Sequence, residues 1–307
     1  MIVRTVLGDI DPADLGLTLG HEHIYAVPPS DVIDPDLRLD DEALAQRELE
    51  LFATAGGRSV IEMTTIDYGR DAAVMTRISA ASGVHLIAAT GYNKGKFADR
   101  ISSTLTTEAI AAWMIDEVQH GIAGSTAKAG LIKASSSLDG PGPHERRVFE
   151  AAAVAHRATN APISTHTEKG SWAIGQVQLL GDHGVPADRI LLGHLDLKPD
   201  LGYLREVAAT GAFLGFDQFA KAKYLADADR IALVVALVAD GHGHQIMLSG
   251  DMARRSYHQA HGGGPGFAHI PSTILPALQS AGLSSTDIEM LAVGNPRRFL
   301  AFDPVAT

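Results

Sequence analysis

The fold is decided at Leu17-Thr18-Leu19-Gly20-His21-Glu22-His23, a short apolar run that ends in His-Glu-His. The run predicts a β-strand, and helical spacing follows it. A doubly wound open sheet usually carries a glycine-rich, phosphate-binding turn after its first strand. A barrel instead carries catalytic residues at the ends of its strands. Two imidazoles in place of the glycines therefore favour the barrel.

Seven more apolar runs follow, each succeeded by a longer segment with helical spacing. The eight predicted strands are Leu17–Leu19, Ser59–Met63, Val84–Ala89, Gly130–Lys133, Pro162–Thr165, Arg189–Leu192, Ala212–Gly215 and Gln245–Leu248. The predicted helices lie near 41–55, 71–82, 106–120, 144–159, 171–182, 200–209, 226–239 and 271–281, and several begin with Asp, Thr or Ser in capping positions. Because eight strands make a barrel, we expect an α/β fold: residues 1–307 form one (β/α)8 TIM barrel with a closing helix at Asn295–Phe302.

Composition narrows the class of function. The chain has 307 residues and a formal net charge of −11, which argues against a nucleic-acid partner. It contains no cysteine, which excludes disulfides, thiolate nucleophiles and cysteine-based zinc sites. No apolar stretch of about 18 residues is present, and Met1–Thr5 do not open a signal peptide. We expect a cytoplasmic protein with a small-molecule substrate and no membrane contact, and the oligomeric state stays open, a homodimer included.

Metal-capable or charged residues stand at the carboxyl end of strand after strand, where core packing does not require them. Parallel strands of a barrel all end at one face, so such side chains can converge although they are far apart in sequence. The residues at these positions are His21 and His23 after the first strand, Lys133 after the fourth, His166 after the fifth, His194 after the sixth and Asp251 after the eighth.

The His-Glu-His spacing fits a strand, because residues two apart point to the same side. Both imidazoles can then face the barrel axis while Glu22 points outward. The chain contains a second such pair, His242 and His244, at the beginning of the eighth strand. Seven residues separate His244 from Asp251, roughly 23 Å along an extended strand. We therefore expect this pair to lie at the opposite face and not to bind metal.

Two of the strand-end residues are costly to bury. Asp251 lies three residues after the end of the apolar run Ile246–Leu248, where an unpaired carboxylate would need a compensating cation. Lys133 cannot coordinate a cation as an ammonium. It could extend out of the strand end to solvent, or it could react with CO2 to give a carbamate that bridges two metals, a reaction that a lowered lysine pKa would favour.

The motifs at these positions, in this order, resemble the phosphotriesterase family of the amidohydrolase superfamily. They are Gly20–His23, Leu131–Lys133, Thr165–Thr167, Gly193–His194 and Ser249–Asp251, and the likeness extends to Leu15–Leu19 and Gly294–Phe299. The resemblance implies two divalent cations, one held by His21, His23 and Asp251 and the other by His166 and His194, with N6-carboxylated Lys133 bridging them. It also implies that a metal-bridging hydroxide attacks the substrate and that Asp251 accepts the proton. Zinc is the default metal, and manganese, cobalt or iron would suit the same ligands.

The loops after the strands indicate the substrate. Tyr92, after the third strand, resembles the lactonase branch of the family. Basic pairs follow the third, seventh and eighth strands, namely Lys94 with Lys96, Lys221 with Lys223, and Arg254 with Arg255. Together with Tyr257 and the glycine-rich run that follows it, they favour an anionic substrate and resemble members that hydrolyse phosphorylated sugar lactones. The predicted substrate-binding residues are Tyr92, Lys94, Lys223, Arg254, Arg255 and Tyr257.

Three alternatives remain open. An acyl-homoserine lactonase, with organophosphate triesterase activity as a side reaction, would need an apolar channel to which Phe97, Phe219 and Phe267 could contribute. An N-acyl amide hydrolase would use the same metal centre. A barrel that binds a metal or ligand without turnover belongs to another class, and Lys133 and Asp251 argue against it because a pure binder needs no proton acceptor.

Overall fold

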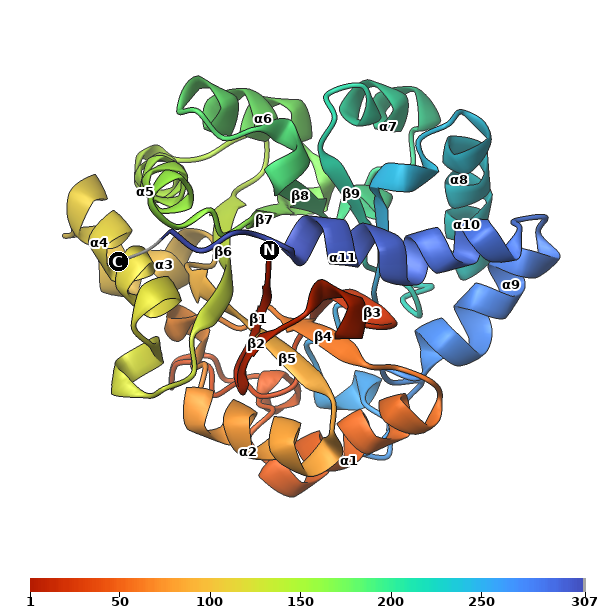
Figure 1. The fold of residues 1–307 in the computed structure, drawn as a ribbon, viewed down its shortest axis with the longest axis horizontal. Helices are drawn as coiled ribbons and strands as arrows, with labels where there is room; N and C mark the ends of the chain where they lie inside the picture. Colours follow the sequence, from red (N-terminus) through yellow and green to blue (C-terminus); the bar gives the residue numbers. More distant parts are fainter. Residues whose placement is uncertain (306–307) are drawn as a thin grey trace.

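The computed structural model describes residues 1–305, whose centre is an eight-stranded parallel sheet (Figure 1). The strands are β3 (Thr18–Glu22), β4 (Ser59–Glu62), β5 (His85–Gly91), β6 (Ala129–Ser136), β7 (Ile163–Thr167), β8 (Ile190–Gly193), β9 (Phe213–Phe216) and β10 (Ile246–Leu248), and neighbours in sequence are neighbours in the sheet. Contacts between the outermost strands close it, since Asp251 N donates to His21 O at 3.1 Å and His21 N donates to Ser249 Oγ at 3.0 Å. The predicted (β/α)8 barrel is confirmed.

Helices surround the strands in a ring (Figure 1). They are α1 (Glu42–Thr54), α2 (Ala72–Ser82), α3 (Gly95–Ser102), α4 (Thr107–Gln119), α5 (Pro143–Thr159), α6 (Ala173–Asp182), α7 (Leu201–Ala208), α8 (Asp227–Ala239), α9 (Leu275–Ser280), α10 (Ser285–Glu289) and α11 (Asn295–Leu300). The predicted capping residues Asp41, Thr106 and Asp200 each accept a hydrogen bond from a backbone N–H of the first turn. Among residues 1–305, no helix is both long and apolar enough to cross a membrane.

The structure adds elements that the sequence pattern did not predict. A hairpin of β1 (Val3–Thr5) and β2 (Gly8–Ile10) precedes the barrel and is held by paired contacts of Arg4 with Asp9 at 2.8 and 2.9 Å. Helix α3 lies within a segment predicted as a loop, and its N-cap residue Lys94 makes no side-chain capping bond. The usual sequence signal for a helix start is therefore missing there.

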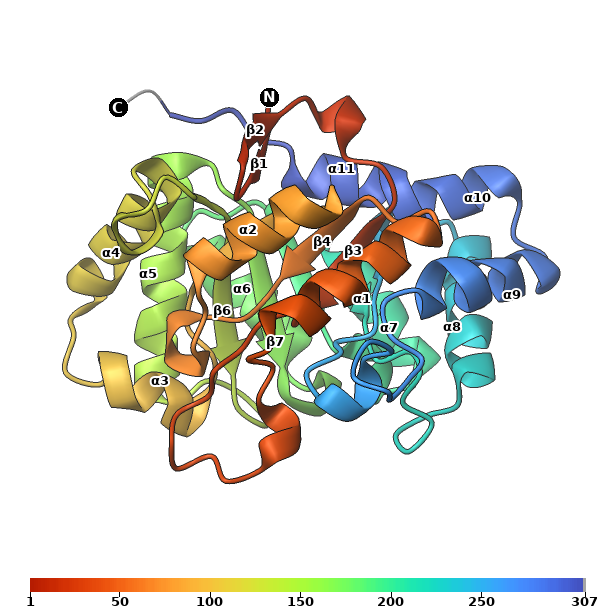
Figure 2. The same cartoon turned by 90° about the horizontal axis from the view of Figure 1, so that it is seen from below.

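The barrel interior is packed and closed at one end. Inward side chains of several strands, among them Ile61, Leu131 and Met247, form a buried cluster that Phe299 and Leu300 of α11 complete. Helix α11 and the β1–β2 hairpin lie together at this end, whereas α3 and the loops that follow the strands lie at the other (Figure 2). The functional residues predicted at the strand ends therefore face away from the closing helix.

Candidate metal centre

The strand-end histidines come together at the open end of the barrel. The ring centroids of His21 and His194 are 4.7 Å apart, those of His166 and His194 are 4.5 Å apart, and those of His21 and His23 are 5.7 Å apart. His21, His23 and His194 are buried, and His166 is partly buried. Four imidazoles from three strands and the turns after them thus meet in one cluster, as the barrel geometry predicted.

His21, His23 and Asp251 form a group that could hold a metal ion. The Nε2 atoms of His21 and His23 lie 3.7 and 3.4 Å from the same carboxylate oxygen, Asp251 Oδ1. Burial lowers the pKa of His23 to about 3 and lowers the pKa of His21 well below its usual value. Both rings are therefore held neutral, the form that binds a cation.

Hydrogen bonds assign the free nitrogen of His23. Its Nδ1 lies 2.8 Å from Thr64 Oγ1, and this hydroxyl donates to Glu62 Oε1 at 2.6 Å. The hydroxyl must accept from His23, so Nδ1 carries the proton and the lone pair stands on Nε2, beside Asp251. In His21, buried Nδ1 makes no hydrogen bond within residues 1–305. His21 Nδ1 lies 3.5 Å from Asp217 Oδ2, on the side away from Asp251. Neutral histidines whose Nε2 atoms face one carboxylate oxygen fit a divalent metal such as zinc.

The other two histidines are oriented by carboxylates. His194 Nδ1 donates to Asp217 Oδ1 at 2.7 Å, and His166 Nε2 lies 3.2 Å from Glu168 Oε2. Burial alone would lower the pKa of His194, but the charge and hydrogen bond of Asp217 raise it above the usual value. His21, His194 and Asp217 also meet as a group that could hold a metal. Because Asp217 already accepts from both the backbone N–H and the ring of His194, we assign it an orienting role.

Lys133 lies within this cluster. Its side chain is 2% exposed, and Nζ donates to Met63 O at 2.9 Å. Burial lowers the pKa of Lys133, against the attraction of Asp67 and Asp251. Its charge in turn lowers the pKa of His21, His23 and His166. A lysine that extends to solvent, one of the two sequence interpretations, is therefore wrong.

Asp251 has partners that the sequence analysis did not predict. Gln218 Nε2 and Lys221 Nζ donate to Asp251 Oδ2 at 2.8 and 2.9 Å. Lys221 was expected among the loops around the open end of the barrel, which we call the mouth. It is instead 5% exposed, because it lies against this carboxylate. Burial would raise the pKa of Asp251, yet Lys221 and the neighbouring histidines hold it well below its usual value.

A signal for part of this network was present in the sequence. Asp217 directly follows the apolar strand β9, and Asp251 lies three residues after β10. Extending the strand-end rule to the seventh strand of the barrel would have identified Asp217.

The Glu22 side chain points away from the barrel interior, as the alternation of side chains along a strand predicted, but it does not reach solvent. It is fully buried and accepts hydrogen bonds from Ser249 Oγ, Gly250 N and Met252 N, each at 2.7 Å. Burial raises its pKa to about 8, although these three donors favour the ionised form. The residue between the two histidines therefore contacts the segment that carries Asp251.

The predicted substrate-binding residues with basic side chains lie on the loops around the mouth, where acidic partners hold most of them. Lys94 pairs with Glu168, Arg254 Nη1 lies 2.7 Å from Asp34 Oδ2, and Arg255 Nη2 lies 2.6 Å from Asp40 Oδ1. Lys223 Nζ instead donates to the hydroxyl of Tyr257 at 2.7 Å. The loop between β3 and α1 thus neutralises part of the positive charge predicted at the mouth.

Tyr92, a predicted substrate-binding residue, is buried by packing against a helix. Its side chain is 2% exposed and stacks on Trp113 of α4 with ring centroids 5.1 Å apart. Its pKa is raised to about 12 by burial and by the charges of Asp67 and Glu117. This packing between β5 and α4 argues against a substrate contact by the Tyr92 side chain.

His242 and His244 lie at the amino end of β10, as predicted. His244 Nδ1 contacts Gly241 O at 2.9 Å, and the adjacent Gly243 O accepts from Asn295 Nδ2 of α11 at 2.8 Å. The pair therefore lies at the closed end of the barrel, beside the terminal helix.

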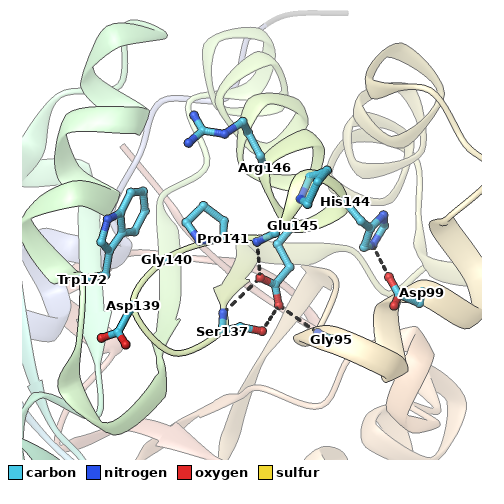
Figure 3. A pocket seen from close by; sticks show the side chains of 12 residues that line it. Gly95, Asp99, Ser137, Asp139, Gly140, Pro141, His144, Glu145, Arg146 and Trp172 are labelled. Carbon is cyan, nitrogen blue, oxygen red and sulfur yellow. Dashed lines mark hydrogen bonds and ion pairs between the residues drawn. The ribbon is translucent and has the colours of Figure 1, made fainter.

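Two cavities adjoin the mouth on the side of β5, β6 and β7. The larger, of about 580 Å³, is lined by Asp99, Asp139, His144 and Trp172 among others (Figure 3). Glu145 also lines it, but its carboxylate is engaged by Ser137, Gly95 and Gly142 (Figure 3). The second cavity, of about 410 Å³, includes Lys94 and Glu168 and so reaches the partner of His166. None of the predicted metal ligands lines either cavity.

Comparison with known proteins agrees with this arrangement. Residues 1–300 match the phosphotriesterase family. The chain is 37% identical over 285 residues to the phosphotriesterase homology protein of Escherichia coli, covering 92% of this chain and 97% of that protein. It is 32% identical to the phospho-furanose lactonase of Mycoplasmopsis synoviae, over 98% of this chain and 92% of that protein.

A solved structure of a lactonase from Listeria monocytogenes superimposes with a TM-score of 0.94 at 33% identity, covering 99% of this chain and all of that one. The structural match covers the whole barrel, and the sequence match covers nearly the full length of the chain. The chain belongs to the phosphotriesterase family of hydrolases.

Proposed function

We propose that the protein is a binuclear metal-dependent lactonase that opens a phosphorylated sugar lactone. One observation carries the proposal: the Nε2 atoms of His21 and His23 lie 3.7 and 3.4 Å from one oxygen of Asp251. Lys133 beside them is 2% exposed, and its charge lowers the pKa of His21, His23 and His166. Two divalent cations, with zinc as the default, would supply an activated water and polarise the carbonyl of the substrate.

The residues of this chain then have distinct roles. His21, His23 and Asp251 would hold one ion, and His166 and His194 the other. Lys133, as its N6-carbamate, would present an oxygen to each, and its lowered pKa favours the neutral amine that reacts with CO2. Asp251 would also accept the proton of the attacking water. Its depressed pKa keeps the carboxylate ionised, which is the form that can coordinate a cation.

The phosphate would bind at the mouth, near Lys223, Arg254 and Tyr257. Lys223 and the Tyr257 hydroxyl are already hydrogen-bonded to each other, so two donors stand side by side on the loops after β9 and β10. The relative from Mycoplasmopsis synoviae is named for a phosphorylated furanose lactone, which supports this substrate class.

The apolar channel that an acyl-homoserine lactonase would need finds less support. Phe219 and Phe267 are 0% and 1% exposed, so they cannot line a channel open to a substrate. Phe97 remains half-buried against Tyr68, with ring centroids 5.2 Å apart. An anionic lactone therefore agrees better with the residues at the mouth.

A hydrolysis screen of the metal-loaded protein tests the proposal. The substrates are sugar lactones with and without a 5-phosphate, acyl-homoserine lactones, N-acyl amides and paraoxon. We expect the highest kcat/KM for a phosphorylated lactone. A preference for a long-chain acyl lactone or an N-acyl amide would replace the substrate assignment, and no turnover of any substrate would favour a binding protein.

A further inference from the structure

The carboxylate of Asp251 is carried on an unusual backbone. Its φ is 46°, in the left-handed region that residues other than glycine rarely adopt. Such a conformation persists only where the surrounding structure holds it, and it is common at functional sites. Something in the fold must therefore hold the segment from Ser249 to Met252 in place.

Glu22 makes the contacts that hold this segment. Its Oε1 accepts from Gly250 N and its Oε2 accepts from Met252 N, so one carboxylate binds the N–H groups directly before and after Asp251. Oε1 also accepts from Ser249 Oγ. Glu22 itself is fully buried, so solvent cannot replace these bonds.

Glu22 also stands between two of the predicted metal ligands. His21 precedes it on β3, His23 directly follows the strand, and His21 O accepts from Asp251 N at 3.1 Å. One short strand and the residue after it therefore carry two imidazoles and, through Glu22, set the position of the third predicted ligand.

We propose that Glu22 is a positioning residue that fixes the Asp251 carboxylate opposite His21 and His23 and so determines the affinity of this one metal site. The inference rests on the proposed metal centre and deepens it. Glu22, the middle residue of His-Glu-His, would not bind the metal itself. It would act through its hydrogen bonds to the backbone on either side of Asp251.

The variant Glu22→Gln tests the proposal at nearly constant volume. The amide oxygen can replace one carboxylate oxygen, but the amide NH2 then faces a backbone N–H or a hydroxyl, so at least one of the three bonds is lost. We expect a folded protein in which one of two metals binds roughly tenfold to a hundredfold more weakly, the range seen when an outer partner of a ligand is removed. The kcat should fall while KM changes little.

Glu48→Gln is the matched control. Glu48 is also fully buried and accepts two backbone N–H groups, from Ala260 at 2.7 Å and Phe267 at 2.9 Å, later in the segment that follows β10. It makes no hydrogen bond to a predicted metal ligand. Its loss should lower the melting temperature and leave both metal affinities and kcat unchanged.

The readouts are calorimetric titration of the metal-free proteins with Zn²⁺, metal content after dialysis, and steady-state kinetics. If Glu22→Gln does not fold, Ser249→Ala removes one of the three bonds to Glu22 together with the contacts of Ser249 Oγ with the His21 backbone, and it should weaken the same metal site. Two metals bound by the variant with wild-type affinity and unchanged kcat would overturn the role of Glu22 alone. A wild-type protein that takes up no metal would overturn the proposed function together with this inference.

Discussion

Lys133 carries a buried amine, and Met63 O accepts its only hydrogen bond within residues 1–305. If it is carboxylated, Lys133→Ala should reduce the metal content from about two equivalents per chain and abolish most activity. Bicarbonate or a short carboxylic acid should restore part of both, because each can occupy the space of the carbamate. Metal analysis and kinetics with and without these acids measure the effect.

Two controls accompany Lys133→Ala. Lys96→Ala removes an exposed lysine of the mouth, and the double variant His242→Ala/His244→Ala removes the pair at the closed end of the barrel. Both should retain two metals. Full activity in Lys133→Ala would show that no carbamate is needed, and metal loss in the double variant would contradict its assignment as a non-ligand pair.

His23 makes the stability of the metal-free protein depend on pH. Its folded pKa of about 3 lies below the usual value of 6.5, so between these values the unfolded chain binds a proton that the folded chain does not. The contribution of neutral His23 to the free energy of unfolding is fully present above pH 6.5 and is lost as the pH falls toward 3. Between pH 7 and pH 5, His23 therefore lowers the free energy of unfolding by about 2 kcal/mol.

The comparison is between wild-type protein and His23→Asn, each unfolded by urea without metal at pH 5 and pH 7. The wild type should lose more stability on acidification than the variant, because asparagine does not titrate. Equal losses would mean that His23 is not held neutral by the fold.

At the scale of elements, the segment after β10 and the loop between β3 and α1 are joined by ion pairs. Arg254 contacts Asp34 and Asp36, and Asp36 also accepts from Ser256 N and Oγ at 2.8 and 2.7 Å. The two loops thus hold the mouth in one arrangement. A substrate phosphate that binds Arg254 must share it with these aspartates.

Arg254→Ala separates recognition from loop structure. If Arg254 binds the phosphate, kcat/KM for a phosphorylated lactone should fall roughly tenfold to a hundredfold in the variant. This range corresponds to the loss of about 1.5 to 3 kcal/mol from a charge-assisted hydrogen bond. The same lactone without phosphate should be hydrolysed at nearly the wild-type rate. If both substrates slow alike, Arg254 acts through the loop contacts, and Asp36→Asn should then reproduce the loss.

At the scale of the whole molecule, the metal centre and the core lie in different parts of the barrel. The interior below the histidines is filled by apolar side chains, and α11 closes the far end. We therefore expect chelation to leave a folded barrel, unlike small domains that unfold without their metal.

Because a metal that binds only the folded state stabilises it, the metal-free protein should melt at a lower temperature. At a free metal concentration a hundred times the Kd, metal binding stabilises the folded state by about 2.7 kcal/mol. Calorimetry before and after chelation, with circular dichroism to follow the secondary structure, measures both effects. Loss of all helical signal on chelation would show that the core depends on the metal.

The architecture and the meeting of the strand-end residues at one face could be predicted from local patterns. Each strand is a short apolar run, and a barrel brings all strand ends to one face, so residues such as His21, Lys133 and Asp251 could be brought together without knowledge of any side-chain contact. The predicted strand positions agree with the structure because hydrophobic periodicity and burial share one cause, the removal of apolar surface from water.

The environment of those residues could not be predicted in the same way. Glu22 binds the backbone of Met252 across 230 positions of the chain, Lys221 turns inward to Asp251, and Arg254 meets Asp34 across 220 positions. Hydrogen bonds and ion pairs between distant loops leave no periodic trace in a sequence. Their partners are chosen when the closed barrel buries a charge that must then be satisfied by whichever donors the fold has brought within reach.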